Sequence, residues 1–262
     1  MALNYSSNNI SYSKVGTGPH LCFLHGFCEN RSTWNQLIPH LQTTYTCISI
    51  DLPAFGDSQD ASFESLKDIA LSIHRILQHE NAEESILFGH SMGGYILAEY
   101  LYHFGSKLKG AGFIHSSAAE DLPAKKISRT KTIDFIESHG SADFFKIFVP
   151  SLVADINLSR LKPSLKKLVS NTSNDAILKG LAAMRDRLDH TNTIAEFTKP
   201  ILFLCGAEDN HYPKHNVYNQ ASNCQLVQVE SIQNVGHLSP LEAPEECLIS
   251  ICKFLQFVKN LE

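Results

Sequence analysis

The feature that most limits the possible folds of this chain is residues 85–94, SILFGHSMGG, where a short apolar run ends in a serine between glycines. Gly89, Ser91 and Gly93 form a G-x-S-x-G pattern, which places the serine on a strained turn between a strand and a helix. Side chains at the two glycines would collide with the neighbouring strand and helix. Because residues 95–101 contain no proline or glycine, we expect a helix to begin near Ser91, with its free N–H groups close to the hydroxyl.

A five-residue pattern is modest evidence by itself, because a glycine-rich turn without chemical function also produces it. The chain has 262 residues, of which 43% are hydrophobic and 19% charged. This is enough for a substantial core in one α/β domain or two smaller ones. The net charge of -5 offers no basic surface for nucleic acid, so a small, neutral or weakly polar molecule is the expected partner.

The sequence predicts a cytoplasmic protein without a membrane partner. Its first residues lack the basic start and apolar core of a signal peptide, and no apolar run reaches the roughly 18 to 20 residues that span a bilayer. The seven cysteines lie mostly in apolar runs and are expected to be reduced. The histidines include no H-E-x-x-H or H-x-H spacing and no C-x-x-C pair exists, so we expect neither a metal nor another cofactor.

Strand-like and helix-like segments alternate along the first part of the chain. Apolar runs that suit strands buried on both faces are found at 21–25, 47–50, 85–90 and 110–115. Helical spacing of apolar residues is found at 30–41 and 63–80. Residues 9–15 alternate and precede a turn cluster at 16–19, which predicts an antiparallel edge strand and hairpin. Together these segments predict a mostly parallel sheet flanked by helices, with ligands at the carboxyl ends of the strands.

The alternation stops between residues 119 and 197, where the chain becomes polar and helical. We interpret residues 119–197 as an inserted helical cap (lid), between a first part of the α/β core at 1–118 and a second part at 198–262. Basic residues of this insertion are expected to form a solvated face, whereas the apolar run 144–149 requires burial. The basic residues are Lys125, Lys126, Arg129, Lys131 and those within 162–167.

The sheet resumes with a strand at 200–206, a helix at 214–221, a strand at 225–229 and a closing helix at 244–258. The first of these strands runs into Asp209, and the second is followed by the loop that carries His237. Both loops should lie at the same sheet edge as Ser91, in the chain order serine, acid, histidine. Core packing alone does not readily explain three such matches in order.

With these residues in place, the whole chain resembles α/β-hydrolase-fold enzymes, and in particular the carboxylesterase-like and lactonase-like members with an H-G-F oxyanion loop. The residues that carry the resemblance are His25-Gly-Phe27, the loop 51–58, Gly89-His-Ser-Met-Gly-Gly94, Gly206-Ala-Glu-Asp209 and Gly236-His237. Ala54 stands where such loops usually carry glycine. This departure affects the expected details of that turn and not the expected chemistry. The resemblance implies a serine hydrolase that needs no cofactor and cleaves a small carboxylic ester or lactone.

Acyl transfer gives each candidate residue a role. Ser91 is the expected nucleophile, and His237 takes its proton and returns it to the leaving group. Asp209 fixes the tautomer of the imidazole and stabilises the imidazolium. Backbone N–H groups of Phe27 and Met92 form the expected oxyanion hole.

Each catalytic assignment has an alternative. Asp209 could be only a turn former, with Glu208 as the nearest substitute, and His237 could be a structural histidine. His211 and His215 are expected to point toward solvent or a helix start. His90 is expected to alternate away from the pocket.

Substrate contacts are expected from His115 and from the aromatic side chains of Trp34, Phe144 and Phe148, although aromatic residues more often belong to the core. His25 is expected to brace the oxyanion loop. Arg187 and Asp189 could pair to anchor the cap, and two unpaired surface charges are the equal alternative.

Other functions remain open on this scaffold. A C–C bond hydrolase, a thioesterase or a perhydrolase would use the same site, and a slow or non-catalytic ligand-binding protein would keep only the fold. A serine at position 91 disfavours dehalogenases and epoxide hydrolases, which need aspartate there. The sequence carries no signature of an oligomeric state.

Overall fold

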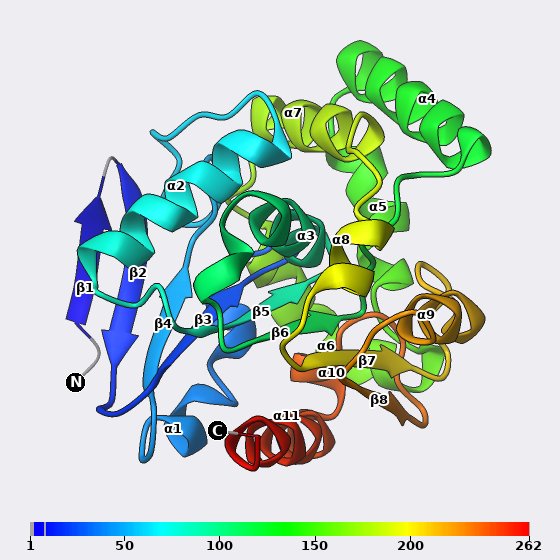
Figure 1. Ribbon diagram of the computed structural model, residues 1–262. Helices are drawn as coiled ribbons and strands as arrows, with labels where there is room; N and C mark the ends of the chain where they lie inside the picture. Colours follow the sequence, from blue (N-terminus) through cyan, green and yellow to red (C-terminus); the bar gives the residue numbers. More distant parts are fainter. Residues whose placement is uncertain (1–2, 8, 262) are drawn as a thin grey trace.

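The computed structural model describes residues 3–7 and 9–261 and is organised around one mixed sheet (Figure 1). Its strands in the described part of the chain are, in spatial order, β1 (Leu3–Ser7), β2 (Ile10–Val15), β4 (Thr46–Ile50), β3 (His20–Leu24), β5 (Ile86–His90), β6 (Gly110–Ile114), β7 (Ile201–Gly206) and β8 (Val227–Ile232). From β4 to β8 all neighbouring strands are parallel, whereas β1 and β2 are antiparallel additions. The expected α/β class with a mostly parallel sheet is confirmed.

The edge of the sheet differs from the prediction. β2 is not the edge strand, because β1 pairs with its outer side and β4 with its inner side. The turn at 16–19 therefore does not close a hairpin. It leads into β3, which lies beyond β4 and pairs with it in parallel, His20 opposite Thr46.

Helices cover both faces of the sheet. On one face lie α2 (Leu66–His79) and α3 (Met92–Phe104), and on the other α1 (Ile38–Leu41) and α11 (Pro244–Lys259), as Figure 1 shows. Two buried apolar clusters result, one under each helical layer. The other short helices of the core are η1 (Arg31–Trp34), η2 (Gly105–Lys107), α9 (Lys214–Ala221) and α10 (Ser239–Glu242).

The helix expected at 30–41 is broken into η1 and α1. Pro39 is the cause, because proline lacks the N–H that a continuous helix needs and its ring clashes with the preceding turn. The chain instead starts a new helix with Pro39 in its first turn. By contrast, α2 forms as expected, and a capping box between Ser65 and Asp68 fixes its start.

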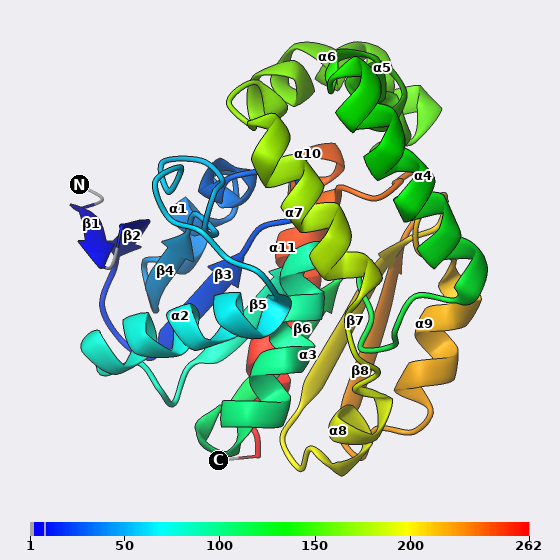
Figure 2. The same cartoon turned by 90° about the horizontal axis from the view of Figure 1, so that it is seen from above.

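Between β6 and β7 the chain forms only helices. These are α4 (Pro123–His139), α5 (Ala142–Ser151), α6 (Asp155–Val169), α7 (Asn174–Arg185) and α8 (Thr191–Glu196). Figure 2 shows α4 to α7, here called the cap helices, gathered at one side of the sheet. α8 lies apart from them and packs on α3. The division into a cap at 119–197 and two core parts, at 1–118 and 198–262, stays a prediction.

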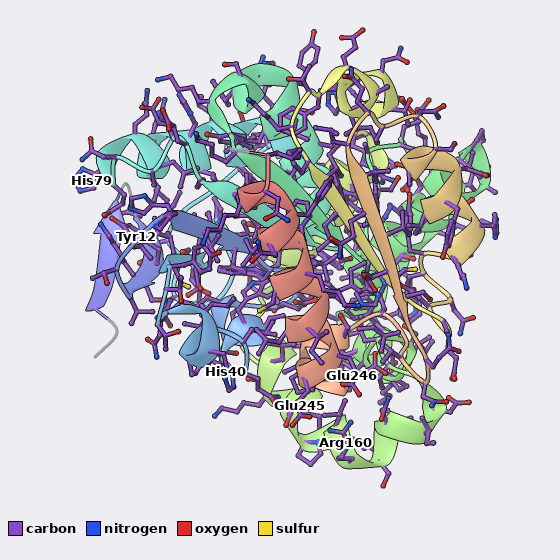
Figure 3. The ribbon with its side chains drawn as sticks, turned by 60° about the horizontal axis from the view of Figure 1, so that its bottom comes forward. Tyr12, His40, His79, Arg160, Glu245 and Glu246 are labelled. Carbon is purple, nitrogen blue, oxygen red and sulfur yellow. The ribbon has the colours of Figure 1, made fainter. Side chains whose placement is uncertain are left out.

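One cap helix is hydrogen-bonded to α10 of the core. Arg160 of α6 donates a hydrogen bond to the carbonyl of Glu242 at 2.9 Å. In Figure 3 this arginine lies beside the first turn of α11, where Glu245 and Glu246 are found. The Arg160 bond therefore ties α6 to the segment that follows the expected catalytic histidine.

All seven cysteines are free. Five are buried, as expected, whereas Cys224 is half-buried and Cys252 exposed. In the described ranges, no helix combines the length and apolar character needed to cross a membrane.

Candidate active site

Ser91 lies between the end of β5 and the start of α3, in a backbone conformation that is rare for a residue with a side chain. Its φ is 49° and its ψ is -115°. A Cβ atom at Gly89 would lie 2.3 Å from the carbonyl oxygen of Gly93, and one at Gly93 would lie 2.5 Å from that of Leu24. The collisions expected at both glycines are therefore confirmed, and they explain why this turn requires them.

Ser91, His237 and Asp209 form a continuous line of hydrogen bonds. The Ser91 hydroxyl donates to Nε2 of His237 at 2.9 Å, and Nδ1 of His237 donates to Oδ2 of Asp209 at 2.8 Å. Asp209 is buried, whereas its neighbour Glu208 is exposed. Asp209, and not the alternative Glu208, is therefore the carboxylate that faces the imidazole.

The loops after β7 and β8 approach each other without intervening side chains. A Cβ atom at Gly206 would lie 2.1 Å from the carbonyl oxygen of Gly236. Only glycine at this position lets the two backbones pack so closely. This contact sets the separation between the segment that carries Asp209 and the segment that carries His237.

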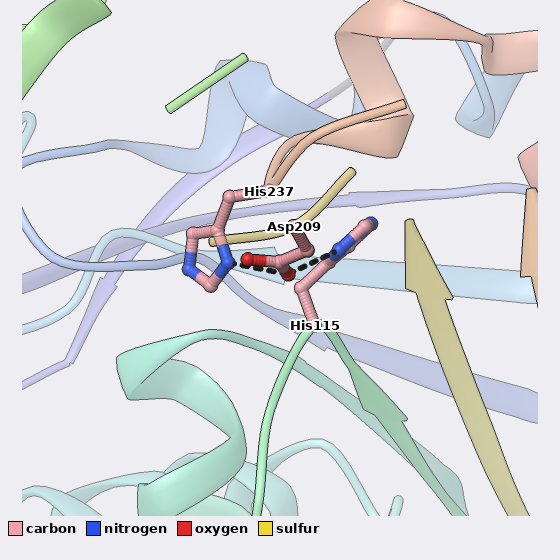
Figure 4. A group of neighbouring side chains, drawn as sticks. All are labelled: His115, Asp209 and His237. Carbon is pink, nitrogen blue, oxygen red and sulfur yellow. Dashed lines mark hydrogen bonds and ion pairs between the residues drawn. The ribbon is translucent and has the colours of Figure 1, made fainter. Parts of the chain in front are cut away.

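Asp209 is held in its ionised form by four hydrogen bonds. Its Oδ1 accepts the backbone N–H groups of His211 and Tyr212, each at 2.9 Å. Its Oδ2 accepts Nδ1–H of His237 and, at 3.0 Å, Nδ1–H of His115, which Figure 4 shows on either side of the carboxylate. Burial alone would raise the pKa of Asp209, but the charge interaction with His237 and the hydrogen bonds from His115 and His237 lower it.

His237 is neutral at neutral pH. Burial lowers its pKa to about 3, although the carboxylate of Asp209 acts in the opposite direction. With Nδ1 donating to Asp209, the lone pair on Nε2 is free to accept a proton from Ser91. This is the tautomer that a general base at this position requires.

A buried glutamate fixes the loop on both sides of His237. The Glu242 carboxylate accepts the backbone N–H groups of Gly236 and Leu238, both at 3.0 Å. It also accepts the N–H of Ala154, at the start of α6, at 2.8 Å. Sequence reasoning missed this residue, and no local pattern marks it, because its partners are backbone groups and the Asn157 side chain, which the tertiary fold brings to it.

His115 is buried behind Asp209 and does not line the cavity at Ser91. The expectation that it contacts the substrate is wrong, because its ring is enclosed between Asp209 and the segment at Ser239. Its Nε2 accepts the N–H of Ser239 at 3.2 Å, which assigns its proton to Nδ1, the atom that donates to Asp209. His115 thus orients the carboxylate from the side opposite to His237.

The ligand atoms of His115, Asp209 and His237 lie within 4.8 Å of one another, a spacing that a metal ion could bridge. The hydrogen bonds argue against such a site. Both histidines carry their proton on Nδ1, the nitrogen that faces Asp209, and a protonated nitrogen cannot ligate a metal. These three residues fit a hydrogen-bond network and not a metal centre.

A second buried pair lies under the site. His90 donates from Nε2 to the carbonyl of His237 at 2.7 Å, and its Nδ1 lies 3.0 Å from the Glu29 carboxylate. Glu29 also accepts the N–H of Gly26 at 3.1 Å. Burial alone would lower the pKa of His90, but Glu29 raises it, and His90 in turn lowers the pKa of Glu29 to about 2 despite burial.

This ion pair connects the loop that carries Phe27 with the loop that carries His237. His90 does lie away from the cavity, as expected, but its pairing with Glu29 was not foreseen. No local signal marks it, because Glu29 is followed by the polar run Asn30-Arg-Ser-Thr33, a composition typical of an exposed turn.

The backbone N–H groups of Phe27 and Met92 are both available as hydrogen-bond donors. In the described part of the chain neither donates to an acceptor. His25 braces the loop, donating from Nδ1 to the carbonyl of Gly26 at 2.8 Å and accepting the N–H of Leu52 at Nε2 at 2.9 Å. The role of these N–H groups as an oxyanion hole stays a prediction.

A cavity of about 70 Å³ adjoins Ser91. Its walls are Phe27, Glu29, Ser91, Tyr95, Lys125, Arg129, Phe148, Leu152, Met184, His211 and His237. Of the aromatic residues expected here, Phe148 is a wall. Phe144 stands behind it, with ring centres 5.0 Å apart.

Trp34 is not at the site, and this expectation is wrong. Its side chain is fully buried and packs against Phe23, with ring centres 5.2 Å apart, in the cluster on the α11 side of the sheet. Leu37 and Leu41, which share the predicted apolar face with Trp34, pack in the same cluster, so this face is a core face and not a pocket wall.

Three polar residues differ from their expected positions. Lys125 and Arg129 line the cavity, so they do not belong to a solvated face, and His211 is also a wall and does not point to solvent. His215, as expected, is exposed. Burial lowers the pKa of His211, and the positive charge of Lys125 lowers it further.

Arg187 does form an ion pair, but with another partner than the predicted one. Its Nη1 donates to Asp121 at 2.7 Å, whereas Asp189 binds the hydroxyl and N–H of Thr191 at the start of α8. Sequence proximity suggested the pair Arg187 and Asp189. The fold instead brings Asp121, which precedes α4, to the guanidinium.

Comparisons with known proteins agree with this architecture. A pimeloyl-[acyl-carrier protein] methyl ester esterase of Vibrio campbellii is 24% identical, over 79% of this chain and 83% of the relative. Methylesterase 3 of Arabidopsis thaliana is 25% identical, over 92% and 96%. Two other curated relatives are much longer, and the chain spans 15% of one and 44% of the other.

Among solved structures, a malate-bound thermophilic esterase from Thermogutta terrifontis superposes with a TM-score of 0.88 at 21% identity, covering 98% of this chain and 99% of that one. This likeness shows the fold. The alpha/beta hydrolase fold family matches residues 19–244, which is most of the sequence. The chain therefore belongs to the alpha/beta hydrolase fold family.

Proposed function

We propose that the protein is a serine hydrolase that cleaves a small carboxylic ester or lactone through an acyl-enzyme on Ser91. The observation that carries this proposal is the line of hydrogen bonds from the Ser91 hydroxyl through His237 to the ionised Asp209. The names of the two relatives above, both esterases, favour an ester over a thioester or a C–C bond.

In the proposed reaction, Ser91 Oγ attacks the carbonyl carbon while Nε2 of His237 takes its proton. The developing oxyanion accepts hydrogen bonds from the N–H groups of Phe27 and Met92. His237 then gives the proton to the leaving alcohol, and the acyl group stays on Ser91. Water, activated by the same imidazole, releases the acid and restores the serine.

The test is the Ser91→Ala variant with 4-nitrophenyl esters. If the three residues act as a unit, turnover falls on the order of 10⁶-fold. Ser128→Ala, an exposed serine on α4, is the matched control and should keep the wild-type rate. An unchanged rate in the Ser91 variant would refute the proposal.

A fluorophosphonate probe distinguishes this enzyme from a ligand-binding protein that only keeps the scaffold. An activated Ser91 is labelled, and the modified peptide is identified by mass spectrometry. A serine that is not activated stays unlabelled, which would favour the binding protein. Product analysis with thioesters, β-diketones and peroxide then separates the three alternative reactions of the same site.

A further inference from the structure

Two cationic side chains of α4 reach the cavity that contains Ser91. Lys125 and Arg129 are one helical turn apart and therefore lie on the same face of α4, and both are walls of the cavity. The Arg129 side chain is only 12% exposed. A guanidinium that is mostly buried beside a nucleophile needs a partner or a function.

The negative charge near these cations is not enough to neutralise them. Asp121 accepts Nε–H of Arg129 at 2.5 Å and Nη1–H of Arg187 at 2.7 Å, so one negative charge serves two guanidiniums. The hydrogen bond of Lys125 is a long one, 3.4 Å, to the carbonyl of His211, which is uncharged. The side of the cavity under α4 therefore carries an excess of positive charge.

The other acids around the cavity are already engaged. The charge of Glu29 is balanced by His90. Asp209 uses both oxygens on four hydrogen bonds and lies behind His237. Neither carboxylate is free to pair with Lys125.

Donors on this side also lack acceptors. Within the described residues, neither Nη atom of Arg129 donates a hydrogen bond, and the hydroxyl of Tyr95 makes none. Tyr95 is itself held in place by Arg187, whose guanidinium carbon lies 3.9 Å from the centre of its ring. Lys125, Arg129 and Tyr95 thus converge on one region with donors that a carboxylate would satisfy.

We propose that Lys125, Arg129 and Tyr95 form an anion subsite, so that the substrate cleaved at Ser91 carries a carboxylate. This inference rests on the proposed ester hydrolysis and narrows its substrate class to carboxylate-bearing esters. A hydrogen bond between charged groups in such a site changes binding by about 10- to 100-fold.

The experiment compares matched pairs of esters. One pair is 4-nitrophenyl hydrogen glutarate and its neutral methyl ester, with the carboxylate on the acyl side. The other is 4-carboxyphenyl acetate and 4-carbamoylphenyl acetate, with the carboxylate on the alcohol side. In at least one pair we expect kcat/KM of the wild type to favour the anion by about tenfold or more after subtraction of the spontaneous rate.

The decisive variant is Lys125→Gln, because Lys125 makes no contact with a carboxylate and its loss leaves no buried charge unpaired. The ratio of kcat/KM between anionic and neutral ester should fall about tenfold, and Lys125→Arg should restore it. Lys126→Gln is the control, since Lys126 pairs with Glu120 outside the cavity and should leave the ratio unchanged. Arg129→Gln is a less specific test of the subsite, because it also removes one of the two ion-pair partners of Asp121.

Glutarate binding to the Ser91→Ala variant, measured by calorimetry, tests the subsite without turnover. Binding that is lost when Lys125→Gln is added supports the inference, even if no ester is hydrolysed and the proposed function fails. Hydrolysis of neutral esters with no preference for either anion, and no binding of glutarate, overturns the subsite alone. Absence of both hydrolysis and binding overturns both proposals.

Discussion

His237 determines at which pH the proposed reaction runs. The neutral imidazole is the active base, and burial lowers its pKa from 6.5 to about 3. The acid limb of kcat/KM for a 4-nitrophenyl ester should therefore lie below pH 6.5, because the base stays unprotonated where a free histidine would be charged. A limb centred at 6.5 or above would contradict this environment.

Glu29 and His90 both contribute to stability over only part of the pH range in which this limb is measured. Glu29 has a lowered pKa, so its stabilisation is complete above 4.5, its ordinary value, and is lost as the pH falls toward 2. His90 has a raised pKa, so its stabilisation is complete below 6.5 and is lost as the pH rises through its folded value. Both contributions are present between pH 4.5 and 6.5, and circular dichroism at each pH is the control.

At the scale of elements, the contact between the β7 and β8 loops positions the proposed base. The Gly206→Ala variant adds a Cβ atom 2.1 Å from Gly236 O and 2.3 Å from Val235 O, both backbone atoms that cannot turn aside. We expect a loss of about 1–3 kcal/mol in the free energy of unfolding. A displacement of His237 should lower kcat by about 100-fold.

Gly105→Ala is the matched control for this substitution. The atom nearest to its new Cβ is the end of the Leu101 side chain, at 3.1 Å, which can move. Urea unfolding and ester kinetics should show wild-type values for it. A Gly206→Ala enzyme with wild-type kcat would show that the loop contact does not set the position of His237.

Elements with a strong local pattern were predictable from the sequence. The buried strands, α2 and α11 follow from apolar runs and helical spacing, and Gly89 and Gly93 mark the turn at Ser91. α4 has no such pattern, since Ile136 is its one buried residue. Without an apolar stripe, nothing in the sequence shows which face of α4 turns inward, so the sequence predicts a solvated face for Lys125 and Arg129.

Pairings between distant segments were the other part that the sequence could not predict. The Glu29 and His90 pair joins residues 61 positions apart, and Glu242 binds backbone groups of the His237 loop and of α6. Buried polar groups find partners through the tertiary fold, and their spacing along the chain carries no period. Asp209 and His237 were found because strand ends meet at one sheet edge.

For the molecule as a whole, the start of α4 and the segment after α7 are joined at Asp121, which precedes α4 and binds Arg129 and Arg187. Burial alone would raise the pKa of Asp121, but the two guanidiniums lower it, so the carboxylate is charged. The Asp121→Asn variant leaves both guanidiniums with one neutral neighbour. Removing one partner from a buried ion pair typically costs about 3–5 kcal/mol.

This loss should be local, because Asp121 joins the start of α4 to the end of α7 and has no part in the sheet. Hydrogen exchange of backbone amides in α4 should therefore speed up in Asp121→Asn, while amides of α2 keep their protection. Glu120→Gln is the control, since Glu120 forms an exposed pair with Lys126 and such pairs contribute about 0–1 kcal/mol. Equal exchange in α4 of both variants would mean that the cap is held by apolar contacts such as Phe27 with Phe148, and not by this carboxylate.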